Sequence, residues 1–207
     1  MTPLISIPKK VILASASPRR KELLARMGLS FTVFPSKAEE TVNGLNSLSV
    51  TEQVCILAEK KAEETASRLQ QDCLVIGADT IVVKEDWVLG KPRNREHAIS
   101  MLHSLRGGWH EVLTGVAIID RKMKYRDIAY ECTRVKVAEL TDDEVERYVD
   151  SGEYRDKAGG YAVQGLAAAF ISRLEGCYFN VVGLPVHLLY TMLKKYISCA
   201  EGLDLSY

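Results

Sequence analysis

The stretch "CLVIGADTIVV" at residues 73–83 decides the fold, because it combines a long apolar run with one charged side chain. Aliphatic and β-branched residues dominate it and a turn signal follows at 85–86, which predicts a buried strand. A carboxylate buried without a partner, here that of Asp79, costs on the order of several kcal/mol. Strand ends are where α/β sheets bind ligands, so we expect Asp79 to face a cation, metal or water there. The alternative is a structural ion pair or a turn acid.

Strands and helices intermix along the rest of the chain, and this order predicts an α/β fold with a mixed central sheet flanked by helices. The other predicted strands are 11–15, 30–36, 110–120, 128–140 and 167–176, and the predicted helices are 18–27, 51–70, 94–105, 141–149 and 185–196. Segment 87–92 is predicted as a hairpin partner of the central strand or as a loop. We expect one domain over 1–207, with a loose C-terminal tail from about Ile197.

Composition excludes several classes of protein. The 207 residues carry 27 basic and 27 acidic side chains and are 7% aromatic. A zero net charge argues against a general nucleic-acid or membrane-surface binder, so any anion site must be local. The five cysteines show no C-x-x-C spacing, which favours reduced thiols over a disulfide framework or a zinc site. With no apolar run of spanning length and no signal peptide, the expected location is the cytoplasm.

The segment "SASPRR" at 15–20 begins a predicted helix and places positive side chains at its positively charged end. Ser17 at the N-cap and a proline at the first helical position are ordinary start signals. Residues 19–21 are Arg, Arg and Lys, although a helix N-terminus is already positive and favours acids. A bound anion would relieve this repulsion. The alternative is that the arginines are solvated or paired with the acids at 39–40.

Two further segments carry residues suited to a phosphate ligand. Lys91 lies in "LGKP" between a glycine and a proline, and the alternative is that it is merely solvated. The loop "DKAGGYAVQG" at 156–165 places Lys157 and Gln164 beside two glycines that allow close ligand approach. Its glycine pattern is neither a Walker A motif nor a Rossmann fingerprint. The four histidines (97, 103, 110 and 187) are interpreted as structural or surface residues. Together, cations, acids and glycine-rich loops indicate phosphoryl or nucleotidyl hydrolysis.

The segments "SASPRR", "GADTIVV", "LGKP" and "DKAGGYAVQG", in this order and spacing, resemble the Maf family of nucleotide pyrophosphatases. The resemblance covers about residues 9–196, and four motifs in order are far more specific than one. It implies two lobes of an α/β fold with a substrate cleft between them. It also implies a house-cleaning enzyme that uses Mg²⁺ or Mn²⁺ to hydrolyse nucleoside triphosphates to the monophosphate and pyrophosphate.

The resemblance also assigns roles to individual residues. It implies that Asp79 is the essential acid, as water-activating base or metal ligand, and that Glu40 helps to site the metal. It implies catalytic roles for Lys91 on phosphate and for Gln164 near the substrate or the attacking water. The remaining implied substrate-binding residues are Ser17, Arg19, Arg20, Lys61, Thr80 and Lys157.

Substrate and biological role remain open between alternatives. Asp79 followed by Thr80, together with the 156–165 loop, resembles the group that prefers dTTP and UTP, rather than the sister group that prefers 7-methyl-GTP. Ala162 departs from the glycine that many relatives carry at this position. A nucleotide-binding regulator of cell division or septum formation is the alternative function, and turnover discriminates the two. The resemblance also implies a homodimer, and helix 185–196 fits either an interface or the core.

Overall fold

The computed structural model describes residues 4–38, 48–85 and 87–200. The chain divides into two compact units. Unit 1 comprises residues 1–79, 114–131 and 183–207, and unit 2 comprises residues 80–113 and 132–182. Across the described ranges, no helix combines the length and apolar character needed to cross a bilayer.

The strands of the described residues form a seven-stranded mixed sheet, as predicted. They are β1 (Lys10–Leu13), β2 (Phe31–Val33), β3 (Cys73–Lys84), β4 (Trp87–Leu89), β5 (Trp109–Asp120), β6 (Tyr125–Val137) and β7 (Ile171–Glu175). Their order is β2-β1-β3-β5-β6-β7, with β4 paired to β3. β1 pairs in parallel with β2 and β3, whereas the pairs β3–β4 and β6–β7 are antiparallel. The three long strands β3, β5 and β6 contribute residues to both units.

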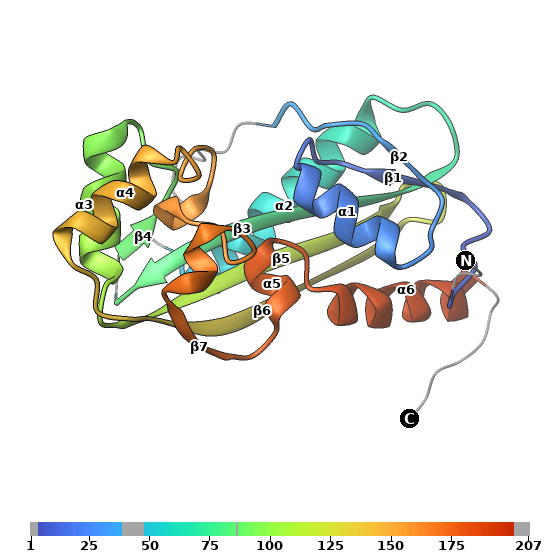
Figure 1. Cartoon of the computed structure of the whole chain (residues 1–207). Coiled ribbons are helices and arrows are strands. Elements are labelled where there is room, and N and C mark those ends of the chain that lie inside the picture. The colour runs from blue at the N-terminus through green and yellow to red at the C-terminus, as the bar shows by residue number, and fades with distance from the viewer. Residues whose placement is uncertain (1–3, 39–47, 86, 201–207) are drawn as a thin grey trace. The chain divides into compact units, whose positions relative to one another are not determined.

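Figure 1 shows the helices that accompany the sheet. They are α1 (Pro18–Arg26), α2 (Val50–Ser67), α3 (Arg95–Leu105), α4 (Asp142–Asp150), α5 (Tyr178–Val182) and α6 (Val186–Ala200), with the 3₁₀ turns η2 (Ala158–Gly160) and η3 (Leu166–Ala169). Helices α1 to α4 begin at capping residues, which are Ser17, Ser49, Asn94 and Thr141. Thr141 and Glu144 form a capping box at the start of α4, and a second one joins Ser49 and Glu52 at the start of α2. Each satisfies backbone N–H groups that the first helical turn leaves without partners.

In unit 1, α2 lies unusually close to the sheet. A Cβ atom on Gly77 of β3 would overlap the carbonyl oxygen of Ala58 and approach Ala62 to 2.9 Å. A Cβ atom on Gly115 of β5 would likewise overlap the carbonyl oxygen of Val54. Two glycines on neighbouring strands therefore let the helix backbone contact the sheet directly. The alanines of α2 face this contact and are fully buried.

A buried ion-pair cluster ties the N-terminal segment and α6 to β5 in the same unit. Asp120 is fully buried, and its Oδ2 accepts hydrogen bonds from Lys9 Nζ at 2.6 Å and from Tyr196 Oη at 2.8 Å. Its Oδ1 accepts the amide of Met123 at 3.0 Å. Burial alone raises the pKa of Asp120, but the hydrogen bond from Lys9 and the other donors outweigh it and hold that pKa below the ordinary value. The cluster satisfies the buried charge, so it does not need an external ligand.

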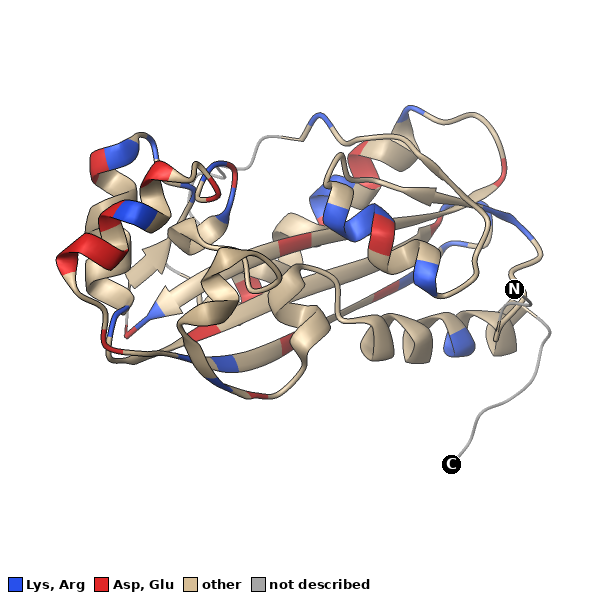
Figure 2. Cartoon of the chain, viewed as in Figure 1, with Lys and Arg blue, Asp and Glu red and all other residues tan. Residues whose placement is uncertain are grey.

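In unit 2, α3 and α4 pack together with charged pairs at both ends of α3. Arg95 contacts Asp150 at 2.8 Å and Arg106 contacts Asp142 at 2.6 Å. These pairs are largely exposed, so they add little stability individually. The buried apolar side chains of α3 supply the packing, and these are Ala98, Met101, Leu102 and Leu105. Figure 2 shows the acidic start of α4 and the basic start of α1 as the charged ends of their helices.

Two predicted boundaries are wrong and one short helix was missed. The segment predicted as a strand at 167–176 begins with the 3₁₀ turn η3, and only Ile171–Glu175 pair with β6. The short helix α5 was not predicted. Residues 197–200, predicted as the start of a loose tail, belong to α6, which continues to Ala200, and the rest of the predicted tail lies outside the described residues. Segment 87–92 resolves as the hairpin strand β4 followed by a loop.

We predict that Gly77→Ala destabilises the protein, because the added methyl group forces α2 away from β3. Overpacking of this kind costs about 1–3 kcal/mol, which is a decrease in Tm of roughly 2–12 °C for a chain of this size. Thermal denaturation followed by circular dichroism measures it. The matched control is Gly90→Ala, since no atom lies within 4 Å of a Cβ at that position and its φ is not positive. Equal stability of Gly77→Ala and wild type would contradict the close approach.

Candidate active site

The loop that follows β1 leads into α1 and carries the first group of predicted site residues. Ser17 is the N-cap of α1, and its Oγ accepts the amide of Arg20 at 3.4 Å. Pro18 occupies the first helical turn, as predicted, and the first turn contains no acid. The positive end of the α1 dipole and the cations Arg19 and Arg20 therefore lie in the same turn. This arrangement is suited to binding an anion.

The structure fixes the direction of the Arg20 side chain. Its Nε donates to the carbonyl oxygen of Gly183 at 2.8 Å and its Nη1 donates to Ser15 Oγ at 3.3 Å. Ser15 is buried, and its Oγ also accepts the amide of Ser17 at 3.2 Å. These contacts hold the plane of the guanidinium relative to the loop. A phosphate ligand would therefore meet a preorganised cation, which reduces the entropy lost on binding.

Asp79 lies on β3 beyond the end of the neighbouring parallel strand. Leu13, the last residue of β1, pairs with Ile76 of β3, so β3 continues three residues further before it reaches Asp79. Asp79 Oδ1 accepts a hydrogen bond from Lys61 Nζ at 2.6 Å, and the two side chains are only 14% and 12% exposed. The predicted partner of the carboxylate is thus a lysine of α2. The pair leaves a partly accessible carboxylate oriented by a cation.

Glu40 and Arg19 are the other residues predicted for this part of the site. Glu40, the predicted metal residue, lies outside the described residues, as does its neighbour Glu39. Arg19 is half-buried on the first turn of α1. Unit 1 therefore brings together Ser17, Arg19 and Arg20 on one turn, and Lys61 with Asp79 in one ion pair.

In unit 2, the backbones of the two other motifs contact each other. The amide of Gly159 donates to the carbonyl oxygen of Gly90 at 3.0 Å, which joins the loop of Lys91 to the glycine-rich loop. Gly159 has a φ of 69°, and a Cβ there would lie 3.1 Å from the side chain of Val82. A glycine is required at this position because a side chain would be strained by both the backbone and the packing.

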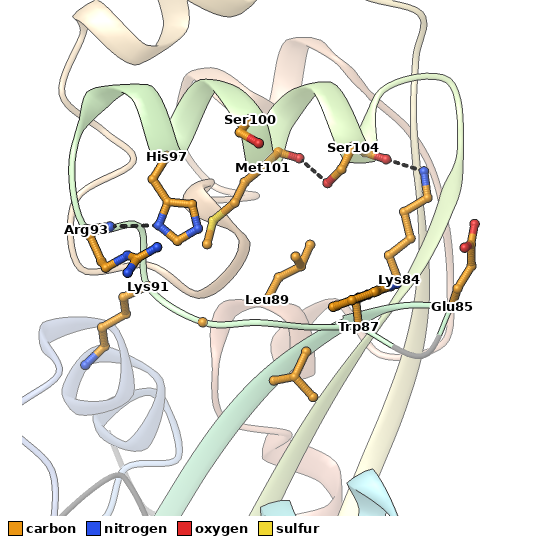
Figure 3. Close-up of a pocket in the computed structure, with 12 residues that line it drawn as sticks. Lys84, Glu85, Trp87, Leu89, Lys91, Arg93, His97, Ser100, Met101 and Ser104 are labelled. Atoms are coloured by element: carbon orange, nitrogen blue, oxygen red, sulfur yellow. Dashed lines mark hydrogen bonds between the residues drawn. The ribbon is translucent and has the colours of Figure 1, made fainter. Parts of the chain in front are cut away.

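Lys91 lies at the edge of a pocket of about 650 Å³ between β4 and α3. Figure 3 shows its side chain extending away from α3, while Arg93 lies beside His97. The Arg93 amide donates to His97 Nδ1 at 3.2 Å, so the neutral ring carries its proton on Nε2. Lys84, at the other end of the pocket, donates to the carbonyl oxygen of Ser104 in the last turn of α3.

The remaining predicted residues of unit 2 lie on the glycine-rich loop and on β3. Gln164 is exposed at a turn, and Lys157 is half-buried with its Nζ 3.2 Å from the carbonyl oxygen of Arg155. Thr80 is half-buried and follows Asp79 directly on β3. The loop itself is anchored by Tyr161, whose hydroxyl lies 2.7 Å from His110 Nε2.

The described residues contain no group of three or more His, Cys, Asp or Glu side chains arranged to hold a metal ion. Asp79 is the predicted metal ligand among them. Mg²⁺ commonly binds through one or two carboxylates together with substrate phosphates and water.

Comparison with known proteins identifies the family. The model of the Maf-like proteins matches residues 10–196. The chain belongs to the Maf family. Among its relatives is a dTTP/UTP pyrophosphatase of Pelotomaculum thermopropionicum, 51% identical over 188 residues that cover 91% of this chain and 97% of the relative. Those of Desulforamulus reducens (50% identical, 91% of this chain, 97% of the relative) and Caldicellulosiruptor bescii (45%, 90% and 94%) carry the same name.

Among solved structures, the Staphylococcus aureus Ham1 protein matches with a TM-score of 0.47 and 16% identity, covering 91% of this chain and all of that chain. A likeness at this level carries no argument about the present protein.

Several residues that organise the site of this Maf protein were not found from its sequence. They are Ser15 and Gly183, which hold Arg20, and His110, which contacts Tyr161. Gly183 is 163 positions from Arg20 along the chain, and it contributes a backbone oxygen, which any residue carries. No sequence pattern marks such a contact. His110, which the sequence indicates to be a structural or surface residue, is buried.

The buried His110 gives a pH-dependent stability that can be measured. Burial, with a smaller contribution from Lys84, lowers the pKa of His110 to about 4. In the unfolded chain the group takes up a proton near pH 6.5, so the unfolded state binds more protons between these values. We predict that the free energy of unfolding falls as the pH drops from 6.5 towards 4, by up to about 1.4 kcal/mol per pH unit from this residue.

The variant His110→Gln removes this titration and still offers a hydrogen bond to Tyr161. Urea denaturation at several pH values should show a shallower slope for it above pH 4.5, where the carboxylates contribute less. The exposed His187→Gln is the matched control and should keep the wild-type slope. An unchanged slope in His110→Gln would contradict the assignment.

Proposed function

We propose that this Maf protein is a nucleoside triphosphate pyrophosphatase that hydrolyses dTTP and UTP to the monophosphate and pyrophosphate. The support is the full-length similarity, at 45–51% identity, to proteins that carry this name. The structural observation that carries the proposal is the Lys61–Asp79 pair at 2.6 Å, which sets an oriented carboxylate beyond the end of β1. An ionised carboxylate in this position can act as the general base that takes a proton from the attacking water during hydrolysis of a phosphoanhydride.

The cations at the start of α1 bind the phosphates in this proposal. Arg20 is held in place by Gly183 and Ser15, and Arg19 stands beside it on the first turn. A nucleoside triphosphate carries about four negative charges near neutral pH, and charge moves onto pyrophosphate as it leaves. Cations that are already positioned stabilise that developing charge without rearrangement. The repulsion within the first turn of α1 is therefore relieved by the substrate.

Asp79 acts on the attacking water. The water oxygen forms a new bond to the α-phosphorus, its proton passes to the Asp79 carboxylate, and the bond to the α–β bridging oxygen breaks. The electron pair of that bond leaves with pyrophosphate. Lys61 holds the carboxylate through Oδ1 and so fixes the direction from which Asp79 receives the proton.

A divalent cation, Mg²⁺ or Mn²⁺, belongs to the proposal as well. Glu40 and the phosphates would hold it, and a direct bond to Asp79 is the alternative to the role of Asp79 as the base. When bound, it neutralises phosphate charge and acts as a Lewis acid. We predict that excess EDTA removes at least 90% of the turnover and that added Mg²⁺ or Mn²⁺ restores it, measured by release of pyrophosphate. Full turnover of metal-stripped protein would contradict this part.

The residues of unit 2 have the roles that the family resemblance gives them. Lys91 contacts phosphate, Gln164 acts near the substrate or the water, and Thr80 and Lys157 bind substrate. The backbone hydrogen bond between Gly159 and Gly90 supports a joint role for the two loops that carry Lys91 and Gln164. A homodimer and a cytoplasmic location complete the proposal, and sedimentation of the purified protein tests the former.

We predict that Asp79→Asn lowers kcat for dTTP at least about 100-fold, because the amide cannot accept the water proton. The assay separates the nucleotides by chromatography and measures pyrophosphate. Asp143→Asn is the matched control, because that carboxylate is exposed on α4 and pairs only locally with Arg147 among the ion pairs of the described chain. Near-wild-type turnover by folded Asp79→Asn would contradict the role of Asp79.

The same assay separates the proposal from its alternatives. The panel contains dTTP, UTP, CTP, GTP, ITP and 7-methyl-GTP. Turnover of 7-methyl-GTP alone would keep the chemistry and reject the pyrimidine preference. Nucleotide binding without any turnover would instead favour the regulatory protein.

A further inference from the structure

Gln164 lies in a tight turn whose geometry depends on its two ends. The turn spans residues 162–165 and is closed by a hydrogen bond of 3.0 Å from the amide of Gly165 to the carbonyl oxygen of Ala162. Gln164 is the third residue of this turn and is exposed, and η3 begins immediately after the turn, at Leu166. Ala162 and Val163 are buried, whereas Gln164 is exposed and Gly165 is half-buried. The second half of the turn therefore has few packing contacts, and the group that holds its far end decides where the glutamine amide lies.

The first end is anchored in the interior of unit 2. Tyr161, the residue before the turn, is 6% exposed, and His110 is 2% exposed. The tyrosine hydroxyl contacts His110 Nε2 at 2.7 Å, and the two rings meet edge to face with centroids 5.4 Å apart. This contact fixes where the chain enters the turn.

The second end is held by Glu153, which no motif singled out. The amide of Leu166, the first residue of η3, donates to Glu153 Oε2 at 2.9 Å and Oε1 at 3.2 Å. A charged acceptor makes this hydrogen bond stronger than one between neutral groups. Gly165 makes the approach feasible, because a Cβ atom there would overlap the carboxylate.

Glu153 is itself connected to a regular element. Its amide donates to Ser151 Oγ at 3.3 Å, and Ser151 is the C-cap residue of α4. The Ser151 hydroxyl in turn donates to the carbonyl oxygen of Tyr148 at 2.5 Å, inside the last turn of that helix. A short chain of hydrogen bonds therefore runs from α4 through Glu153 to the end of the turn.

We propose that Glu153 is a positioning residue for Gln164: its carboxylate binds the Leu166 amide and so holds the 162–165 turn in the conformation in which the glutamine acts. This inference rests on the proposed function. Leu166 is 56% exposed, so loss of the bond leaves the core of unit 2 intact and releases the turn. The cost appears in the chemical step, because small displacements of a catalytic group reduce the rate sharply.

The test is a double-mutant cycle with dTTP as the substrate. We expect Glu153→Ala to lower kcat by about 10- to 100-fold, with KM changed less than about threefold and Tm within a few degrees of wild type. Glu153→Gln should recover most of kcat, since its amide oxygen can accept the Leu166 hydrogen bond. In a Gln164→Ala background, Glu153→Ala should have no further effect. Glu146→Ala on α4 is the matched control and should behave as wild type.

Three results would overturn the inference. They are an equal loss of kcat on Glu153→Ala with and without Gln164, an unchanged kcat in Glu153→Ala or in Gln164→Ala, and a loss that follows a large drop in Tm. A wild-type protein without turnover would instead refute the proposed function. Amide exchange of residues 162–166, which needs no turnover, should then still be faster in Glu153→Ala; unchanged exchange would overturn the positioning contact itself.

Discussion

The contact of α2 with the sheet is the constraint on which the first group of site residues depends. Gly77 and Gly115 leave no side chain between the strands and the helix backbone, so α2 lies closer than ordinary helix–sheet packing allows. Lys61 stands on the part of α2 that runs along β3, one residue before Ala62, which packs on Gly77. The ammonium group therefore reaches Asp79 two residues further along the strand. A larger residue at either glycine would move the cation away from the acid.

The same principle recurs around the other site residues. Backbone groups take part in the contacts that position the other site segments. Gly183 offers its carbonyl oxygen to Arg20, Gly90 offers its own to the glycine-rich loop, and the Leu166 amide meets Glu153. Preorganisation of this kind fixes cations and amides before a ligand arrives, so binding and catalysis lose less entropy in ordering them. The contacts of the fold thus position the side chains of the motifs, and those side chains bind and activate the reactants.

Sequence reasoning predicted the features whose causes are local. Ser17 marks the start of α1 through the amide of Arg20, three residues further on, and the apolar run at 73–83 marks the central strand. Sequence reasoning failed where tertiary contacts determine the type or the end of an element. The 3₁₀ turn η3 replaces the start of a predicted strand where Glu153 binds its first amide, and α6 extends past its predicted end. The Lys61–Asp79 pair joins residues 18 positions apart, and spacing alone does not reveal it. The family resemblance named both residues, and the structure supplied their contact.

The most direct test of this account is hydrolysis of dTTP and UTP by the purified protein in water enriched in ¹⁸O, with both products weighed by mass spectrometry. Water activated by Asp79 attacks the α-phosphorus, so the account predicts one labelled oxygen in the nucleoside monophosphate and none in pyrophosphate. Label in pyrophosphate, or release of inorganic phosphate with the nucleoside diphosphate, would contradict it.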